Sequence, residues 1–150
     1  MGKRREKLSA IMEDYLETIA VLRQEKGLVR VKDISDKMNV RKPSVTAAMI
    51  LLAKKGLIVH EKYGYIELTA KGAKLANAVR ERHAILKKFF IHVLGVSVRA
   101  AEIDACKIEH SLSKETFNKF TGLVEFMEAQ SEEQHQSWRC KFEKYMQSRT

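Results

Sequence analysis

The spacing of apolar residues changes twice along this 150-residue chain, and these changes constrain the fold more than any other feature. Before residue 56, apolar residues recur three and four positions apart in three successive stretches, which is helical spacing. Two short β-rich runs, LIVHE and YIEL, then lie between residues 57 and 68, joined by the turn Lys62-Tyr63-Gly64. Helical spacing returns after the second run. The sequence therefore predicts a mainly α protein with one small β-hairpin.

The three N-terminal helical stretches are short and separated by stop signals. The first is expected from Leu8 to about Gln24, and the second is the segment VKDISDKM. Pro43 suits the first turn of a third helix, which continues to about Lys55 and is closed by a glycine. This order of elements is typical of a winged helix-turn-helix, whose third helix enters the DNA major groove while the hairpin reaches the backbone.

The C-terminal half is expected to be all-helical. Thr69 is suited to cap the N-terminus of a long helix that ends near Val93. Further helices are expected at roughly 98–112, 114–129 and 131–147. Segment 94–129 has more apolar positions than one helical layer can bury, and we expect them to form a dimer interface. These positions include Leu112, Phe117, Phe120, Leu123, Val124 and Phe126.

The net charge of +9 indicates a polyanionic partner. Residues 1–75 contain 16 Lys and Arg against 9 Asp and Glu, whereas residues 76–150 contain 12 against 10. Because the excess lies in the half with the expected winged helix, double-stranded DNA is the favoured partner. An anionic membrane surface is the second candidate partner. Without a nucleic-acid partner, residues 31–68 would simply form a generic small α+β domain.

Four residues around the start of the third helix are candidates for DNA contacts: Arg41, Lys42, Ser44 and Thr46. The N-terminal part of a recognition helix is the part that meets base edges. An arginine there can read guanine, and a lysine can hold a phosphate.

The segment CKIEH carries three groups with metal-ligand chemistry. Cys106, Glu109 and His110 are spaced i, i+3 and i+4, so a helix would place them on one face. A lone cysteine is, however, more often a small buried apolar residue. The segment by itself therefore leaves a metal site and a coincidence equally open.

Two other helices offer further candidate ligands. Asp14 and Glu17 share one face of the first helix, and His83 lies on the apolar stripe of the long helix. Carboxylates of this kind are more often a solvated surface, and such a histidine is more often hydrogen-bonded in a core. From the residues alone, the choice between a metal site and ordinary structural roles stays open.

Other functional classes find little support in the sequence. Cys106 and Cys140 do not make a disulfide framework, and no apolar run is long enough to span a bilayer. The basic segment MGKRREK leads into a helix rather than an apolar signal segment, so we expect a cytoplasmic protein. The HExxH signature, a Ser/His/Asp order and a phosphate-binding glycine loop are absent, so we expect no enzyme.

Four segments occur in the order found in one family: MEDYLETI at 12–19, RKPSVT at 41–46, RHAILKKF at 82–89 and ACKIEHSLS at 105–113. Through them the chain resembles the metal-dependent repressors of the diphtheria toxin repressor and manganese transport regulator family, over about residues 8–128. The resemblance implies an N-terminal winged helix joined to a helical dimerisation domain, with metal held between them. We therefore expect a DNA-binding domain at 1–75 and a metal-binding and dimerisation domain at 76–150.

The resemblance also implies site residues. The implied metal ligands are Asp14, Glu17, His83, Cys106, Glu109 and His110. The chain is a hybrid, because the manganese branch usually has glutamate at 106, whereas the iron branch usually has methionine at 14. The iron branch's accessory site matches only at His83, since its other positions here are Lys87 and Glu102. Pro43 and Ser44 match positions that contact DNA in relatives, but Ala47 replaces a glutamine of the iron branch.

The resemblance implies a homodimeric, metal-activated transcriptional repressor that binds a palindromic operator and controls metal-uptake genes. Hard oxygen ligands suit Mn²⁺, while a thiolate shifts the preference toward Fe²⁺, Co²⁺ or Zn²⁺. We expect one or two Mn²⁺ or Fe²⁺ ions per subunit. The alternatives are a metal-independent winged-helix regulator that senses a small organic ligand and, with less support, a metalloenzyme.

Overall fold

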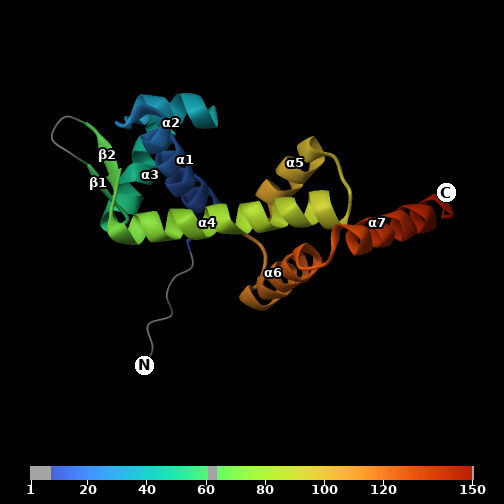
Figure 1. Ribbon diagram of the computed structural model, residues 1–150. Helices are drawn as coiled ribbons and strands as arrows, with labels where there is room; N and C mark the ends of the chain where they lie inside the picture. Colours follow the sequence, from blue (N-terminus) through green and yellow to red (C-terminus); the bar gives the residue numbers. More distant parts are fainter. Residues whose placement is uncertain (1–7, 61–63, 150) are drawn as a thin grey trace. The chain divides into compact units, whose positions relative to one another are not determined.

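The computed structural model describes residues 8–60 and 64–149, which form two compact units. The first unit ends at Arg80 and the second begins at Glu81. This boundary falls inside helix α4 (Ala70–Lys88), so one continuous helix belongs partly to each unit (Figure 1). Among the described residues, no helix is both long enough and apolar enough to cross a membrane.

The first unit combines three helices, a hairpin and the start of α4 (Figure 1). Its other elements are α1 (Ala10–Lys26), α2 (Val31–Met38), α3 (Lys42–Lys54), β1 (Ile58–His60) and β2 (Ile66–Leu68). The two strands pair antiparallel, with Val59 opposite Glu67. These elements follow the order that the sequence predicts. Of the predicted hairpin turn, Lys62 and Tyr63 lie outside the described residues, as does the N-terminal segment MGKRREK.

The turn between α2 and α3 sets how the third helix is presented. Asn39 adopts a left-handed conformation with φ of 54°, and the Ser35 hydroxyl donates a hydrogen bond of 2.6 Å to the Val40 carbonyl. Pro43 lies in the first turn of α3, where its missing N–H leaves no hydrogen bond unmade. The helix α3 begins at Lys42, so Pro43 occupies its first turn as the sequence predicts.

A hydrophobic core holds the helices and the hairpin of the first unit together. Its buried apolar side chains come from α1, the segment before α2, α2, α3, the hairpin with the residue before it, and α4. They are Tyr15, Leu16, Ile19, Leu22, Val29, Ile34, Val45, Ala48, Met49, Leu52, Leu57, Ile58, Ile66 and Ala76. Since α3 turns Val45, Ala48 and Met49 into this core, its opposite face is left for solvent or a partner.

The start of α4 lies directly against the residues that lead into β1. The Thr69 hydroxyl accepts a hydrogen bond of 3.1 Å from the Gly72 N–H and donates one of 2.8 Å to the Gly56 carbonyl. Thr69 is thus the N-cap that the sequence predicts. The Thr69 N–H also donates to the Leu57 carbonyl at 3.0 Å, which ties the beginning of the helix to the hairpin.

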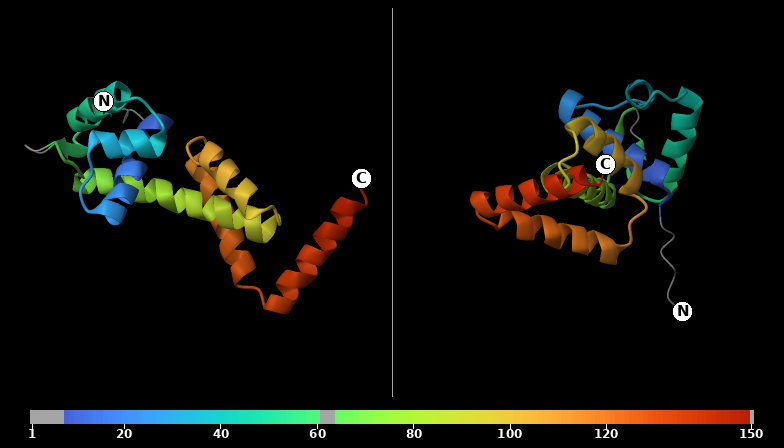
Figure 2. Two further views of the ribbon diagram at one scale, coloured as in Figure 1. Left: turned by 90° about the horizontal axis from the view of Figure 1, so that it is seen from above. Right: turned by 90° about the vertical axis from the view of Figure 1, so that its right-hand side faces the viewer.

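The second unit is all-helical. After α4 come a π-helical turn, η1 (Phe89–Val93), and the helices α5 (Val98–Ile108), α6 (Lys114–Glu128) and α7 (Glu132–Gln147). The helices α6 and α7 meet at one end in an open V (Figure 2). The sequence predicts a helix from about residue 98 to residue 112, but α5 ends at Ile108. It also continues the long helix as a regular helix to Val93, where the structure has the π-helical turn.

Contacts of α6 with η1 and with the end of α4 organise this unit. The rings of Phe89 and Phe120 meet edge to face with centroids 4.6 Å apart, and Lys88 pairs with Glu128 at 2.8 Å. Val124 and Met127 point into the unit and are buried. Val124, which the sequence analysis places at a dimer interface, is therefore a core residue. In contrast, Leu123 and Phe126 are exposed and remain available for such an interface.

Candidate metal centre and DNA-binding surface

A buried carboxylate with an imidazole on each side is the central feature of the second unit. Glu109 is only 1% exposed. Its Oε2 atom lies 2.9 Å from Nδ1 of His83, and its Oε1 atom lies 3.2 Å from Nε2 of His110. A carboxylate is costly to bury unless it is paired or coordinates a metal. Because carboxylate and imidazole are common ligands of divalent first-row metals, this donor set fits a metal ion.

The end of α5 positions Glu109 and His110. Glu109 caps the helix with φ of −56° and ψ of −31°, and its N–H still donates to the Ala105 carbonyl. His110 lies in the turn that follows. Glu109 therefore still lies on the helical face that the sequence predicts for it. His110 follows the end of the helix, so helical spacing alone does not fix the direction of its side chain. His83, one of the residues in α4, supplies the imidazole on the other side of Glu109.

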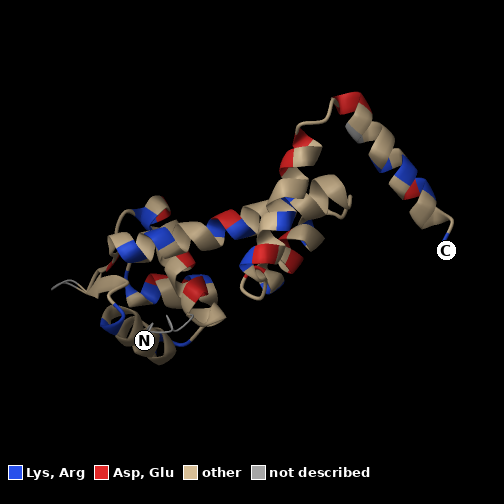
Figure 3. Cartoon of the chain, turned by 90° about the horizontal axis from the view of Figure 1, so that it is seen from below, with Lys and Arg blue, Asp and Glu red and all other residues tan. Residues whose placement is uncertain are grey.

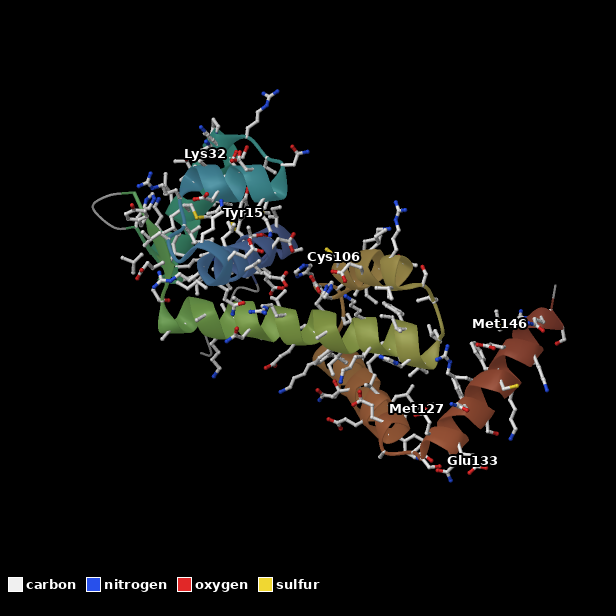
Figure 4. All side chains as sticks on the ribbon, turned by 45° about the horizontal axis from the view of Figure 1, so that its top comes forward. Tyr15, Lys32, Cys106, Met127, Glu133 and Met146 are labelled. Atoms are coloured by element: carbon white, nitrogen blue, oxygen red, sulfur yellow. The ribbon has the colours of Figure 1, made fainter. Side chains whose placement is uncertain are left out.

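Cys106 lies in the last turn of α5, where Figure 4 labels it. Cys106 therefore lies at the C-terminal end of α5, as do Glu109 and His110. Unlike Glu109, Cys106 is exposed. Its role as a metal ligand stays a prediction.

The second nitrogen of His83 has its own carboxylate partner. Nε2 of His83 lies 3.0 Å from Oε1 of Glu102 in α5, and Nζ of Lys87 lies 2.5 Å from Oε2 of the same carboxylate. The hydrogen bond from Lys87, aided by the nearby His83, lowers the pKa of Glu102 below its usual value. Lys87 and Glu102, the two positions that do not match the accessory site of the iron branch, thus pair with each other.

The contact between Glu102 and His83 is not among those that the sequence motifs predict. A signal was present, because Glu102 lies four residues before Cys106 and so on the same side of α5. Helical spacing gives only this side. It does not say that the side faces His83, since that depends on how α5 packs beside α4.

The predicted ligands Asp14 and Glu17 belong to the first unit. They lie one turn apart on α1, and both are half-buried. The second unit by itself therefore brings together His83, Glu109 and His110. The assignment of Asp14 and Glu17 as ligands stays a prediction.

All five candidate DNA-contacting residues are exposed at the start of α3: Arg41, Lys42, Pro43, Ser44 and Thr46. The Thr46 hydroxyl donates a hydrogen bond of 3.0 Å to the Lys42 carbonyl, which leaves its oxygen able to accept one. Lysine and arginine positions recur over the helices of the first unit (Figure 3). The start of α3 therefore presents cationic and hydroxyl groups together, as phosphate and base contacts require.

Comparison with known proteins identifies the family. Residues 7–66 match the model described as "Iron dependent repressor, N-terminal DNA binding domain". Residues 69–138 match the one described as "Iron dependent repressor, metal binding and dimerisation domain". The HTH-type transcriptional regulator MntR of Lysinibacillus sphaericus is 38% identical over 117 residues, covering 78% of this chain and 84% of that protein. The chain belongs to the iron-dependent repressor family. The resemblance predicted from the four sequence motifs is confirmed.

Solved structures of the iron-dependent repressor family show the same fold. A manganese-dependent transcriptional repressor in complex with manganese is similar with a TM-score of 0.70 and 26% identity, over 77% of this chain and 53% of that one. The metal-dependent transcriptional regulator MtsR is similar with a TM-score of 0.71 and 26% identity, over 77% and 54%. The chain spans about half the length of these structures. The predicted fold class, a winged helix-turn-helix followed by a helical domain, is confirmed.

Membership of the iron-dependent repressor family decides between the functional classes. The family consists of metal-dependent transcriptional repressors with a DNA-binding part and a metal-binding, dimerising part, rather than of enzymes. A metal-independent sensor of an organic ligand and a metalloenzyme both fit these matches less well than the predicted repressor. His83, Glu109 and His110 all lie within the stretch that matches the metal-binding part.

Proposed function

We propose that this protein is a cytoplasmic, homodimeric repressor that Mn²⁺ or Fe²⁺ activates to bind a palindromic operator of metal-uptake genes. The observation that carries this proposal is the buried Glu109 carboxylate between the imidazoles of His83 and His110. The similarity to a manganese-dependent transcriptional repressor supports Mn²⁺. The thiol of Cys106 supports Fe²⁺ or another softer metal as the alternative.

Ligands from both units would hold the metal. His83, Cys106, Glu109 and His110 would come from the second unit, and Asp14 and Glu17 would come from α1 of the first. A bound divalent ion supplies positive charge that several carboxylates can share. Shared coordination would restrict the orientation of the DNA-binding unit and so the spacing of the two recognition helices in a dimer. DNA affinity then rises because metal favours one of two conformational states.

An interface between two copies follows from the exposed apolar residues of the second unit. Val98, Ile103, Leu123 and Phe126 are each more than one third exposed, with Val98 at 61% and Phe126 at 60%. Large apolar side chains that folding leaves exposed are candidates for burial against a partner. A twofold dimer would place two copies of α3 on the two halves of a palindromic operator.

Fluorescence anisotropy with a labelled operator fragment tests the proposed function. We expect tight binding in the presence of Mn²⁺ or Fe²⁺, loss of binding when a chelator removes the metal, and recovery when metal is added back. Equal affinity with and without chelator would support a metal-independent regulator. An absence of DNA binding under any metal condition would contradict the assignment as a repressor.

The recognition-helix assignment predicts the effects of Arg41→Ala and Lys42→Ala. Each should weaken operator binding and leave metal affinity unchanged, because both side chains are exposed at the start of α3. If the contact is to a phosphate, the slope of log affinity against log salt should fall by about one unit. Lys141→Ala in α7 is the control and should change neither quantity. Wild-type DNA affinity in both variants would rule out this placement.

The hybrid ligand set predicts that Cys106 tunes metal preference. With Co²⁺, the wild-type protein should show a sulfur-to-metal charge-transfer band in the near ultraviolet, and Cys106→Ser should abolish it. Cys140→Ser is a matched control, since both thiols are exposed. Cys106→Glu should strengthen activation by Mn²⁺ relative to Fe²⁺, because it replaces a soft donor with a hard one. A band that persists in Cys106→Ser would show that the thiol is no ligand.

A further inference from the structure

The His83 imidazole lies between two carboxylates that have different surroundings. On the Nδ1 side, Glu109 is 1% exposed and also contacts His110. On the Nε2 side, the Glu102 side chain is 52% exposed and pairs with Lys87. Glu109 and, through it, His110 therefore lie on the Nδ1 side of His83, whereas the Nε2 side faces a surface ion pair.

We propose that Glu102 and Lys87 are positioning residues of the metal centre. Glu102 accepts the Nε2–H of His83 and so directs the Nδ1 lone pair toward the metal, while Lys87 holds the Glu102 carboxylate in place. This inference rests on the proposed function, because it takes His83 as a ligand. It adds two residues that are not themselves ligands.

The chemistry of imidazole explains why such a partner matters. A neutral histidine that ligates metal through one nitrogen carries its proton on the other, and the partner of that N–H fixes the tautomer and the ring orientation. A carboxylate partner also makes the ligating nitrogen more basic. Glu102 has the geometry for this role, since its Oε1 atom lies 3.0 Å from Nε2 of His83.

Lys87 makes Glu102 a poor ligand and a good acceptor. Its ammonium nitrogen lies 2.5 Å from the second carboxylate oxygen, where a metal bound to Glu102 would meet a like charge. His83 and Lys87 are both on α4 and one turn apart, so the helix fixes their spacing. Glu102 on α5 engages both, and the three side chains thus link the two helices beside the ligands.

Calorimetric titration with Mn²⁺ tests the positioning role. Glu102→Ala should weaken Mn²⁺ affinity by about 10–100-fold, the range typical of outer partners of metal-bound histidines. Glu102→Gln should weaken it less, since its amide oxygen can still accept the N–H. Glu128→Gln is the matched control, because Glu128 also pairs with a lysine of α4, has the same 52% exposure and contacts no candidate ligand in the described structure. It should bind Mn²⁺ like the wild type.

Imidazole NMR of the Zn²⁺-loaded protein gives a readout that general destabilisation would not change. In the wild type, His83 should be metal-bound at Nδ1 and protonated at Nε2, with the Nε2–H protected from exchange. Glu102→Ala should keep Nδ1 ligation and lose this protection. Glu102→Gln, which conserves the side-chain volume, guards against a folding defect.

Two outcomes would overturn the positioning role. One is an Mn²⁺ affinity within about twofold of the wild type in both Glu102 variants, where the positioning role predicts a loss of about 10–100-fold for Glu102→Ala. The other is metal bound at Nε2 of His83, which would make Glu102 a neighbouring ligand instead. A failure of the proposed function gives a different result: His83→Ala would then bind Mn²⁺ as tightly as the wild type.

Discussion

Replacing Glu109 with alanine is expected to weaken Mn²⁺ binding by more than about 100-fold, beyond the 10–100-fold typical of outer partners. Glu109 contacts both candidate imidazole ligands and is almost fully buried. Its loss would remove the charge that offsets the metal's and the oxygen atoms that lie between His83 and His110. Metal-dependent DNA binding should disappear with it.

Glu109→Gln separates charge from shape, because glutamine fills the same volume without the negative charge. Metal that binds only the folded state raises thermal stability, so Mn²⁺ should raise the midpoint of wild-type unfolding. Neither Glu109 variant should show this shift. Glu115→Gln on α6, an exposed carboxylate, is the control and should respond like the wild type. A full Mn²⁺-induced shift in Glu109→Gln would contradict the assignment of Glu109 as a ligand.

The order of elements could be predicted from the sequence, but some boundaries could not. The predicted α2 spans Val31–Met38 as observed, because Asn39 ends the apolar stripe in a left-handed turn. The fifth helix was expected to continue to residue 112, since apolar and ligand-like residues keep helical spacing beyond Ile108. Apolar residues can keep helical spacing in the turn that follows a helix, so their spacing does not locate the end of the helix.

The site shows a similar division. His83, Glu109 and His110 were identified from motifs, and the structure places them in contact within one unit. For the link from His83 to Glu102, helical spacing indicates only the side of α5 on which Glu102 lies, because the contact joins α4 to α5 and depends on their packing. Spacing within one helix gives a shared face, whereas a pair between helices needs the tertiary structure.

Gly72→Ala is expected to destabilise the first unit strongly. A Cβ at this position would lie 1.9 Å from the Leu57 carbonyl oxygen and 2.9 Å from its carbon. That carbonyl accepts the Thr69 N–H at 3.0 Å, and the Leu57 N–H donates to the Leu52 carbonyl at 3.0 Å, so Leu57 cannot move away without losing hydrogen bonds. Overpacking of this kind costs about 1–3 kcal/mol, and a clash with backbone belongs at the upper end.

Gly122→Ala in α6 is the matched control for this substitution. Apart from the backbone of its own helix, no atom of the described residues lies within 4 Å of the Cβ it would add, and alanine favours a helix interior over glycine by about 0.5–1 kcal/mol. The two changes are chemically identical but should therefore act in opposite directions. Hydrogen exchange should report faster opening of β1 and the start of α4 in Gly72→Ala only. Unchanged or slower exchange there would mean that the close approach of α4 to Leu57 does not hold this part of the fold.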